Sequence, residues 1–552
     1  MAITYMRKLE QEPETYDSEF TTLTKGINLQ VKNWILERIS TSYSILEIGC
    51  GTGALSKEMA LKGNKVIAID KEYKMINFAM KNYPKDREVD LLYQIGTFTD
   101  FNVESRSKDL MISTFLLSEL GPLEQQLFLR FAWKALKTNG RLLLAEEFIP
   151  SGFWKYNFKM KRWRYKKKLH RLRLKETFLV KWFFNYLEPI GFKLTEKKIW
   201  KHGAIQALEL RKINDSDNEQ NEPGYYLPKP KRFKGLRSQL RIYRCLFTGQ
   251  IDRVPIEPGI YISGKPSKES PIIVTANYEF TYIKVMRNLK GRDAWVLCVD
   301  SRGINVWCAA RGNDFGNKQL IEAVESTGIQ NCSNSKTLVL PQLAAGGVAI
   351  PQLPKTFPYK IKYGPIWSKD LPKYLEDQPK KKPDSMKIAR FSIFHRFRAG
   401  ITHITFLFRK IFIYPILGLI ILFLALGWFD KLVWLGEIVA LIVLINVVIF
   451  VLFPLSFFTR KFIYKGLFFG IINILLFGYL ILLIHDSIIY TLLNLPFIFW
   501  TTFFSTMSFS GYTMSTNPRE IQLEYPIFKQ INRILLIFGL ILMGIGLIFY
   551  II

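Results

Sequence analysis

The sequence has few cysteines, few histidines and few acidic residues for a chain of 552 residues. Its five cysteines are unevenly spaced and do not make the framework of a small disulfide-bonded secreted domain. Only 46 acidic residues face 76 lysines and arginines, so the formal net charge is +30. Residues 1–32 are polar and contain no signal-peptide pattern. With 49% hydrophobic residues, disorder is excluded, and we expect a folded basic part in the cytoplasm.

Charge is scarcest in residues 411–552, which hold seven Lys/Arg and five Asp/Glu. These residues carry a net charge of only +2, so the remaining +28 of the net charge lies on residues 1–410. A helix needs roughly 20 apolar residues to cross a bilayer. Five runs approach this length and predict a bundle of five transmembrane helices within a 411–552 domain: 411–428, 433–453, 463–484, 488–505 and 534–552.

Basic residues cluster before the first of these runs, between the second and third, and between the fourth and fifth. Basic loops stay in the cytoplasm, so this asymmetry predicts a multi-pass protein of the cell membrane with its large N-terminal part inside. The segment 506–533 is too polar for a span, and we expect a cytoplasmic loop there.

Near the N-terminus, an apolar strand over 44–48 runs into a glycine-rich turn, and a second strand over 65–70 ends in Asp70. Glycines allow a close approach of main chain to a ligand. An acid at the end of the second strand can accept the hydroxyls of a ribose. A glycine-rich turn alone is weak evidence for any one cofactor.

Here the turn reads Glu-x-Gly-x-Gly-x-Gly, which resembles motif I of class I S-adenosylmethionine methyltransferases. Strands over 108–114, 141–146, 192–200 and 204–211 follow in the family's order. The resemblance implies a Rossmann-like α/β domain over 1–213, and leaves a non-catalytic copy open. S-adenosylmethionine would then be bound by Glu47, Gly49, Gly51, Gly53, Asp70, Gly96, Thr97 and Ser113.

A basic insert interrupts this domain at residues 155–175, with 11 Lys/Arg, no acid and interleaved aromatics. The pattern fits nucleic acid, an anionic membrane surface or a solvated face. Because the chain is expected to be membrane-anchored, we favour a helix on anionic lipid and regard nucleic acid as the weaker alternative.

A polar linker at 214–224 precedes a second, small α/β domain at 225–380, and a basic juxtamembrane segment at 381–410 follows it. In this domain a buried strand ends at Asp300, and Asn305 is placed to cap a short helix. Cys308 then falls in the first turn, where the helix dipole favours a thiolate, the form that binds soft metals. A packing cysteine is the alternative reading.

The segment Asn305–Ala310 resembles the cap helix of the membrane corrinoid protein of microbial mercury methylation, the HgcA type. The likeness extends over 225–552 and includes a five-span tail. It implies that Cys308 is the catalytic residue and the lower axial ligand of a corrinoid cobalt. It further implies a ferredoxin-like iron–sulfur reductant as partner. Corrinoid-binding residues would be Thr275, Asn305, Val306, Trp307, Ala309, Ala310, Gln342 and Gly347, the two alanines leaving room for the ligand.

The sequence departs from that family over 311–314 and in its fused methyltransferase domain, which puts mercury specificity in doubt. Two functions therefore compete. One is membrane-anchored, corrinoid- and S-adenosylmethionine-dependent methyl transfer to a small molecule or a metal(loid) such as mercury. The other is a membrane-tethered S-adenosylmethionine methyltransferase of a lipid, quinone or other small molecule, whose middle domain is a binding module and whose Cys308 has no role.

Overall fold

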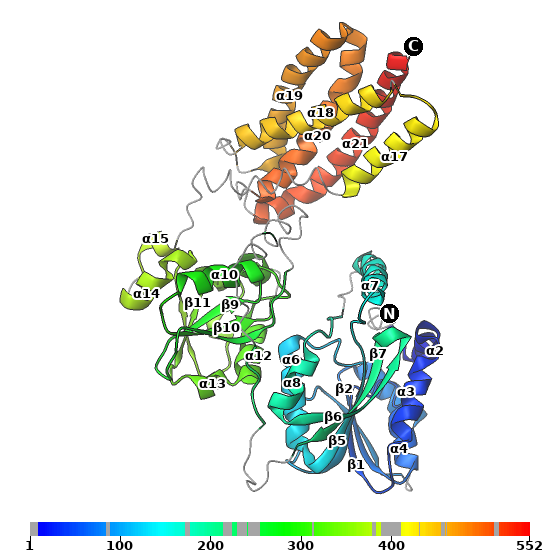
Figure 1. Cartoon of the computed structure of the whole chain (residues 1–552), viewed down its shortest axis with the longest axis vertical. Coiled ribbons are helices and arrows are strands. Elements are labelled where there is room, and N and C mark those ends of the chain that lie inside the picture. The colour runs from blue at the N-terminus through cyan, green and yellow to red at the C-terminus, as the bar shows by residue number, and fades with distance from the viewer. Residues whose placement is uncertain are drawn as a thin grey trace. The chain divides into compact units, whose positions relative to one another are not determined.

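The computed structural model forms two compact units (Figure 1). The first contains both α/β domains, over residues 1–231 and 255–382. The second contains residues 232–254 and 383–552. Residues 214–222 of the predicted linker and most of the 381–410 segment lie outside the described residues. Those described are 9–83, 89–171, 177–213, 223–228, 240, 254–311, 314–377, 382–387, 410–429, 431–453, 459, 461–512 and 518–551.

The first domain is built on a seven-stranded sheet of order β3-β2-β1-β4-β5-β7-β6. β7 runs antiparallel to both of its neighbours. β2 and β4 pair with β1 on opposite sides, so the carboxyl end of β1 is a topological switch point, where open α/β sheets bind ligands. The strands are β1 (Ser44–Ile48), β2 (Lys65–Asp70), β3 (Leu91–Ile95), β4 (Lys108–Thr114), β5 (Leu136–Glu147), β6 (Phe192–Trp200) and β7 (Ile205–Lys212).

Helices cover both faces of this sheet, as its continuously apolar central strands require. On one face the core includes Phe20, Ile35 and Met59, and on the other Phe128 and Phe183. Each such side chain contributes about 1.5–3 kcal/mol by leaving water. The first core takes in α2 (Pro13–Thr24), α3 (Ile27–Leu36), α4 (Ala54–Leu61) and α5 (Tyr73–Asn82), and the second α6 (Pro122–Ala135) and α8 (Phe183–Ile190).

The basic insert forms α7 (Trp154–Arg171). Phe158 is buried, and Arg162 lies 3.1 Å from Glu147 while donating a hydrogen bond of 2.8 Å to the carbonyl of Thr177. These contacts fix the first half of α7 to the domain. Residues 172–175, the end of the predicted insert, lie outside the described residues.

The second domain has a five-stranded sheet of order β12-β11-β9-β10-β8, in which β8 is antiparallel to β10. β10 and β11 flank β9, so the strand order reverses between β9 and β11, which places a second switch point at the carboxyl end of β9. The strands are β8 (Gly259–Ser263), β9 (Ile272–Ala276), β10 (Ala294–Val299), β11 (Thr337–Leu340) and β12 (Lys360–Tyr363). Its main helical segments are α10 (Glu279–Asn288), α11 (Val306–Arg311), α12 (Asn317–Thr327), α13 (Ile329–Cys332), η3 (Gln342–Gly346) and α14 (Leu371–Asp377).

The C-terminal helices are α17 (Lys410–Ala425), α18 (Lys431–Leu452), α19 (Phe462–His485), α20 (Ile488–Tyr512) and α21 (Pro518–Ile551). In the described residues, four are long and apolar enough to cross a membrane, over 431–452, 462–485, 488–507 and 523–548. Ile416–Ala425, in the first predicted span, is a shorter apolar helix, so five spans remain a prediction.

The prediction of a loop over 506–533 is wrong for most of these residues, because they are helical. α20 continues to Tyr512 and α21 begins at Pro518, with 513–517 outside the described residues. Serine and threonine are tolerated there because their hydroxyls bond back to the helix, as Thr506 does to the carbonyl of Thr502 at 2.8 Å.

Candidate functional site

The glycine-rich turn after β1 has a main-chain conformation that only glycine adopts readily. Gly49, Gly51 and Gly53 have φ of +79°, +55° and +78°. At Gly53 a Cβ atom would lie 2.6 Å from Tyr93 Oη and 2.9 Å from Ala79 Cβ, whereas at Gly51 it would meet nothing within 4 Å. Gly53 is therefore needed for packing, and Gly51 leaves the main chain open on the ligand side.

Asp70 at the end of β2 is held by two main-chain donors. The N–H of Gly51 bonds to Oδ2 and that of Glu72 to Oδ1, each at 2.9 Å. Burial raises the pKa of the Asp70 carboxyl, and these hydrogen bonds oppose the rise. The carboxylate is thus oriented before any ligand arrives, beside the glycine turn.

Gly96 and Thr97 form the loop after β3. The amide of Gly96 bonds to the carbonyl of Asp70 at 2.9 Å, so this loop is joined directly to the end of β2. Asp100 accepts a hydrogen bond of 3.0 Å from the amide of Thr97 and fixes the loop. Gly49, Asp70, Gly96 and Thr97 consequently line one cavity, together with Gly51.

Glu47, Gly53 and Ser113 do not line that cavity. Glu47 is buried and accepts a hydrogen bond from Ser56, and burial raises its pKa to about 8. Ser113 donates to the carbonyl of Ile48 at 2.9 Å. These residues support the glycine turn from behind, whereas the sequence pattern placed them among the ligand-binding residues.

In the second domain, Cys308 lies in the first turn of α11 and its side chain is exposed. Asn305 Oδ1 accepts a hydrogen bond of 3.0 Å from the amide of Cys308, as the predicted cap requires. Of the divergent stretch after α11, Gly312 and Asn313 lie outside the described residues. Asp314 follows and lies 3.3 Å from Nε of Arg302, so an ion pair closes the segment that carries α11.

The other predicted residues of α11 face the protein. Val306, Ala309 and Ala310 are buried, and Trp307 is partly buried. Both alanines are covered by their own domain in this structure, and their role beside a ligand stays a prediction. A Cβ on Gly347 would lie 2.6 Å from the carbonyl oxygen of Ala310, so small residues serve a close helix–loop contact.

Asn277, after β9, is a positioning residue that the sequence analysis missed. Its Oδ1 accepts hydrogen bonds from the amides of Ser301, at 2.9 Å, and Gly303, at 3.0 Å. Its Nδ2 donates to Asp300 Oδ1 at 3.0 Å. One buried amide thus fixes the turn that leads into α11, and a single asparagine in a strand-end segment gives little signal of this.

Thr275, near the end of β9, is buried, and no hydrogen-bond partner is found for its Oγ1 among the described residues. A buried hydroxyl without a partner is costly and marks a place where a ligand can supply one. Gln342, predicted beside it as a binding residue, accepts a hydrogen bond from Lys382 instead.

The cavity that contains the glycine turn has a volume of about 1120 Å³. It also includes second-domain residues around α11: Asp300, Arg302, Asp314, Gly316 and Gly347. Gly347 is the predicted second-domain site residue that reaches it, and Cys308 is not in its wall. No sequence pattern indicates that residues of the two domains line one cavity, because their pairing depends on how the domains pack.

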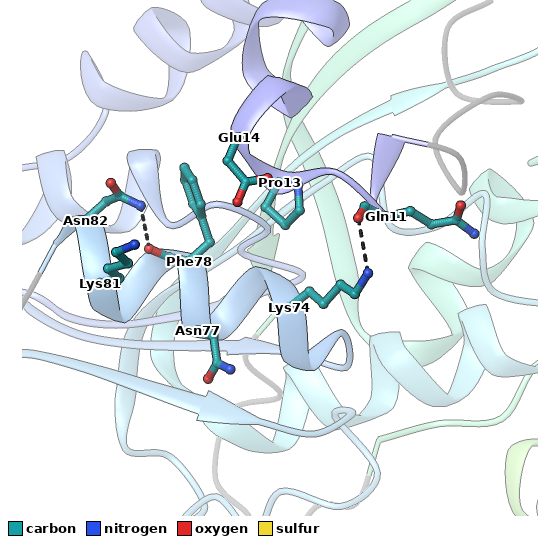
Figure 2. Close-up of a pocket in the computed structure, with 8 residues that line it drawn as sticks. All are labelled: Gln11, Pro13, Glu14, Lys74, Asn77, Phe78, Lys81 and Asn82. Carbon is teal, nitrogen blue, oxygen red and sulfur yellow. Dashed lines mark hydrogen bonds between the residues drawn. The ribbon is translucent and has the colours of Figure 1, made fainter.

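A separate cavity of about 470 Å³ lies between the start of α2 and α5 (Figure 2). Lys74 bonds to the carbonyl of Gln11 at 3.3 Å, and Asn82 to that of Phe78 at 2.9 Å, on its two sides. None of the predicted site residues lines it, so the larger cavity is the candidate site.

Known proteins agree with the division into two kinds of domain. The family model described as "Methyltransferase domain" matches residues 45–140. That described as "CO dehydrogenase/acetyl-CoA synthase delta subunit" matches residues 234–350. The chain thus contains a methyltransferase domain, which makes it a methyltransferase, and a domain similar to the corrinoid iron–sulfur protein family.

Curated relatives match about a quarter of the chain. The acetyl-CoA decarbonylase/synthase complex subunit gamma of Methanopyrus kandleri is 29% identical over 137 residues, 24% of this chain and 29% of that protein. Subunit gamma 1 of Methanosarcina thermophila is 29% identical over 142 residues, 25% of this chain and 30% of that protein. The chain therefore spans less than a third of these relatives.

A solved SAM-dependent methyltransferase from Methanosarcina mazei resembles 33% of this chain over 97% of its own length. The identity is 19% and the TM-score 0.28, too low to carry a functional argument.

Proposed function

We propose that this protein is a membrane-anchored, corrinoid-dependent methyltransferase in which Cys308 is the axial ligand of cobalt. The observation that carries this is an exposed thiol in an N-capped first turn, within a domain similar to the corrinoid iron–sulfur protein family. The unpartnered Thr275 hydroxyl at the neighbouring switch point supports a ligand there.

The residues fit both cofactors. Main-chain groups of Gly49 and Gly51 with the Asp70 carboxylate would hold S-adenosylmethionine. Cys308 and Thr275 would hold the corrinoid, which supplies a cobalt centre able to carry a methyl group. The capped turn keeps the Cys308 sulfur at a defined place, and a thiolate there would push electron density onto the metal, as axial ligands do in other macrocycles.

Such electron donation favours transfer of the methyl group to an electrophile, so we propose a soft metal or metalloid ion of the mercury class as acceptor. A low-potential iron–sulfur protein of the ferredoxin type is the reductant proposed from the family resemblance. Among the described residues, no group of three or more His, Cys, Asp or Glu side chains is arranged to hold a metal ion.

The placement that we propose is the cell membrane, with the α/β domains in the cytoplasm, supported by the basic loops and by four helices long enough to span. α7 would lie on anionic lipid. The first half of α7 exposes Trp154, Tyr156 and Met160 beside Lys155, and Phe153, just before the helix, is exposed too. Apolar and basic side chains on one short helix suit the headgroup region.

The test is the absorption spectrum of the full-length chain, purified in detergent and loaded with cobalamin. For wild type we expect the spectrum of a cobalamin whose own base does not bind cobalt. This spectrum should change in Cys308→Ala. It should be unchanged in Cys332→Ala, which alters a control cysteine of the same domain. Identical spectra in wild type and Cys308→Ala, or cobalamin lost equally from both, would reject the proposal and favour a methyltransferase acting on a lipid or quinone.

A further inference from the structure

The cavity of about 1120 Å³ is lined by both α/β domains of the first unit. Its first-domain wall includes the S-adenosylmethionine residues Gly49 and Asp70, and its second-domain wall includes Asp300 and Arg302. We propose that this cavity is a transfer chamber, in which the methyl acceptor of the first domain is the group held by the second domain. This inference rests on the proposed function and names the substrate of its methyltransferase domain.

Two contacts at the wall join the domains. The guanidinium of Arg302 lies 4.6 Å from the ring centre of Phe178, a cation–π distance. Nζ of Lys318 lies 3.4 Å from Oε1 of Glu124. All four residues line the cavity, and the helices that carry Lys318 and Glu124, α12 and α6, pack against each other. The wall is therefore formed by the packing of the two domains.

A third contact lies between the domains at Tyr225, in the segment that precedes the second domain. The guanidinium of Arg130 on α6 lies 3.4 Å from the centre of the Tyr225 ring. The same ring covers Gly328, where an added Cβ would lie 2.2 Å from it. Tyr225 is thus packed between α6 and the end of α12, and holds those helices in register.

The chamber reaches the segment that carries Cys308. Arg302 precedes α11 and Asp314 follows it, and both line the cavity while pairing at 3.3 Å. The chamber wall therefore includes the residues that flank α11 on both sides. Among the described residues, the α2–α5 cavity shares no lining residue with this one.

Charge in the chamber suits the methyl donor. Nine acidic and three basic side chains line it. Burial raises the pKa of Glu10 to about 9 and of Glu322 to about 8, so these two are largely neutral near pH 7, yet acids still exceed bases. An acidic cavity attracts a sulfonium cation and holds the product, which lacks that charge, less strongly.

The transfer balances within the chamber. The S–CH₃ bond of the sulfonium breaks, and its electron pair stays on sulfur to give S-adenosylhomocysteine. The new bond to carbon forms from an electron pair of the acceptor, a reduced, electron-rich metal centre of the corrinoid class. The ferredoxin-type reductant already proposed returns that centre to its reduced state.

The first experiment measures binding of S-adenosylhomocysteine to the full-length chain by calorimetry, without cobalamin. If the second domain closes the site, Arg302→Ala and Lys318→Glu should weaken binding about three- to ten-fold, although both residues lie outside the methyltransferase domain. Lys336→Glu, an exposed change of the same charge in the same domain, should have no effect. Glu124→Lys combined with Lys318→Glu should restore binding, which a misfolded variant would not do.

The second experiment follows methyl-labelled S-adenosylmethionine with the reduced, cobalamin-loaded chain. The label should reach the cobalamin at a rate that is independent of protein concentration over a ten-fold range. The proposal of a transfer chamber would be overturned by either of two results. One is an unchanged S-adenosylhomocysteine affinity in both Arg302→Ala and Lys318→Glu. The other is a rate of label transfer that is proportional to protein concentration. If cobalamin fails to bind, the proposed function falls, while the calorimetry still decides whether the second domain completes the site.

Discussion

At the carboxyl end of β1 the first domain presents main chain, whereas at the carboxyl ends of β9 and β10 the second domain presents side chains. The first site depends on three glycines with positive φ and one oriented carboxylate. The second depends on a thiol, a hydroxyl without a partner and the turn that Asn277 fixes. The first occupies a switch point and the second lies at and beside one, so topology selects the place and local chemistry selects the ligand.

The largest effect on ligand binding should come from Gly347 in the second domain, although the site of that domain otherwise depends on side chains. In Gly347→Ala, the new Cβ would meet the carbonyl oxygens of Phe315 at 2.2 Å and Ala310 at 2.6 Å. Because α11 must move, we expect at least a ten-fold loss of cobalamin affinity. Gly346→Ala, with open space at its Cβ, is the matched control and should bind normally in the same titration. Equal affinity of the two variants would show that α11 is not held by this contact.

Within the glycine turn the structure separates packing from conformation. Gly53→Ala adds contacts below 3.0 Å to a positive φ and should destabilise the first domain by about 2–4 kcal/mol. Gly51→Ala adds only conformational strain, about 1–2 kcal/mol. Thermal unfolding of the two variants beside wild type measures the difference, and a larger loss for Gly51→Ala would contradict this division.

Asp70→Asn tests the one side chain on which the first site depends. We expect S-adenosylhomocysteine to bind about ten- to a hundred-fold more weakly, since a charged acceptor for the ribose hydroxyls is lost. Burial raises the pKa of Asp70. Wild-type affinity should therefore fall, as pH is lowered, from a higher pH than an ordinary aspartate would give. Calorimetry at several pH values should show a weaker pH dependence in the variant; equal pH dependence would assign the titration to another group.

A smaller effect concerns Glu47 behind the turn. Its pKa is raised to about 8, above the value of about 4.5 for an exposed glutamate, so the folded chain binds a proton that the unfolded chain releases between these values. Stability from this proton is complete below about pH 4.5 and is lost as pH rises towards 8. In Glu47→Gln the decline of the unfolding temperature between pH 5 and 8 should be shallower. An unchanged decline would point to Glu146, whose pKa burial also raises to about 8.

The smallest expected effect concerns neither switch point but α7. In proteoliposomes with brominated anionic lipid, Trp154 fluorescence should be quenched, and Trp154→Phe should reduce total quenching measurably. Lipid without net charge should quench Trp154 less, because the exposed lysines on α7 then lose their counter-charge. Quenching that is equal with and without Trp154 would remove the lipid surface as the partner of this helix.

Much of the fold was predictable because local patterns determined it. The apolar run and acidic end of 65–70 gave β2, and the strands over 108–114 and 192–200 were placed at their observed bounds. Asn305 was predicted as a cap because an N-cap acts on residues two or three positions ahead. Such features need no knowledge of tertiary structure.

What could not be predicted depends on distant packing. Glu47 and Ser113 belong to a family motif, yet they support the turn from behind. Glu47 accepts a hydrogen bond from Ser56 on α4, and Ser113 donates one to Ile48 on the neighbouring β1. Ala309 and Ala310 suggested an open helix face, but small side chains equally permit close packing. Phe178 and Arg302 lie far apart in sequence, and their contact follows from domain packing alone.

Tyr225 has a consequence for how such a chain can change over evolutionary time. Its ring is secured by Arg130 on one side and Gly328 on the other, and it comes after the polar linker. Insertions or deletions in the linker before Tyr225 would change the linker length only. They would leave the contact between the two domains at Tyr225 intact. The tyrosine would thus let two domains of separate ancestry tolerate an imprecise joint, and a change at this one residue would cost more than several changes in the linker.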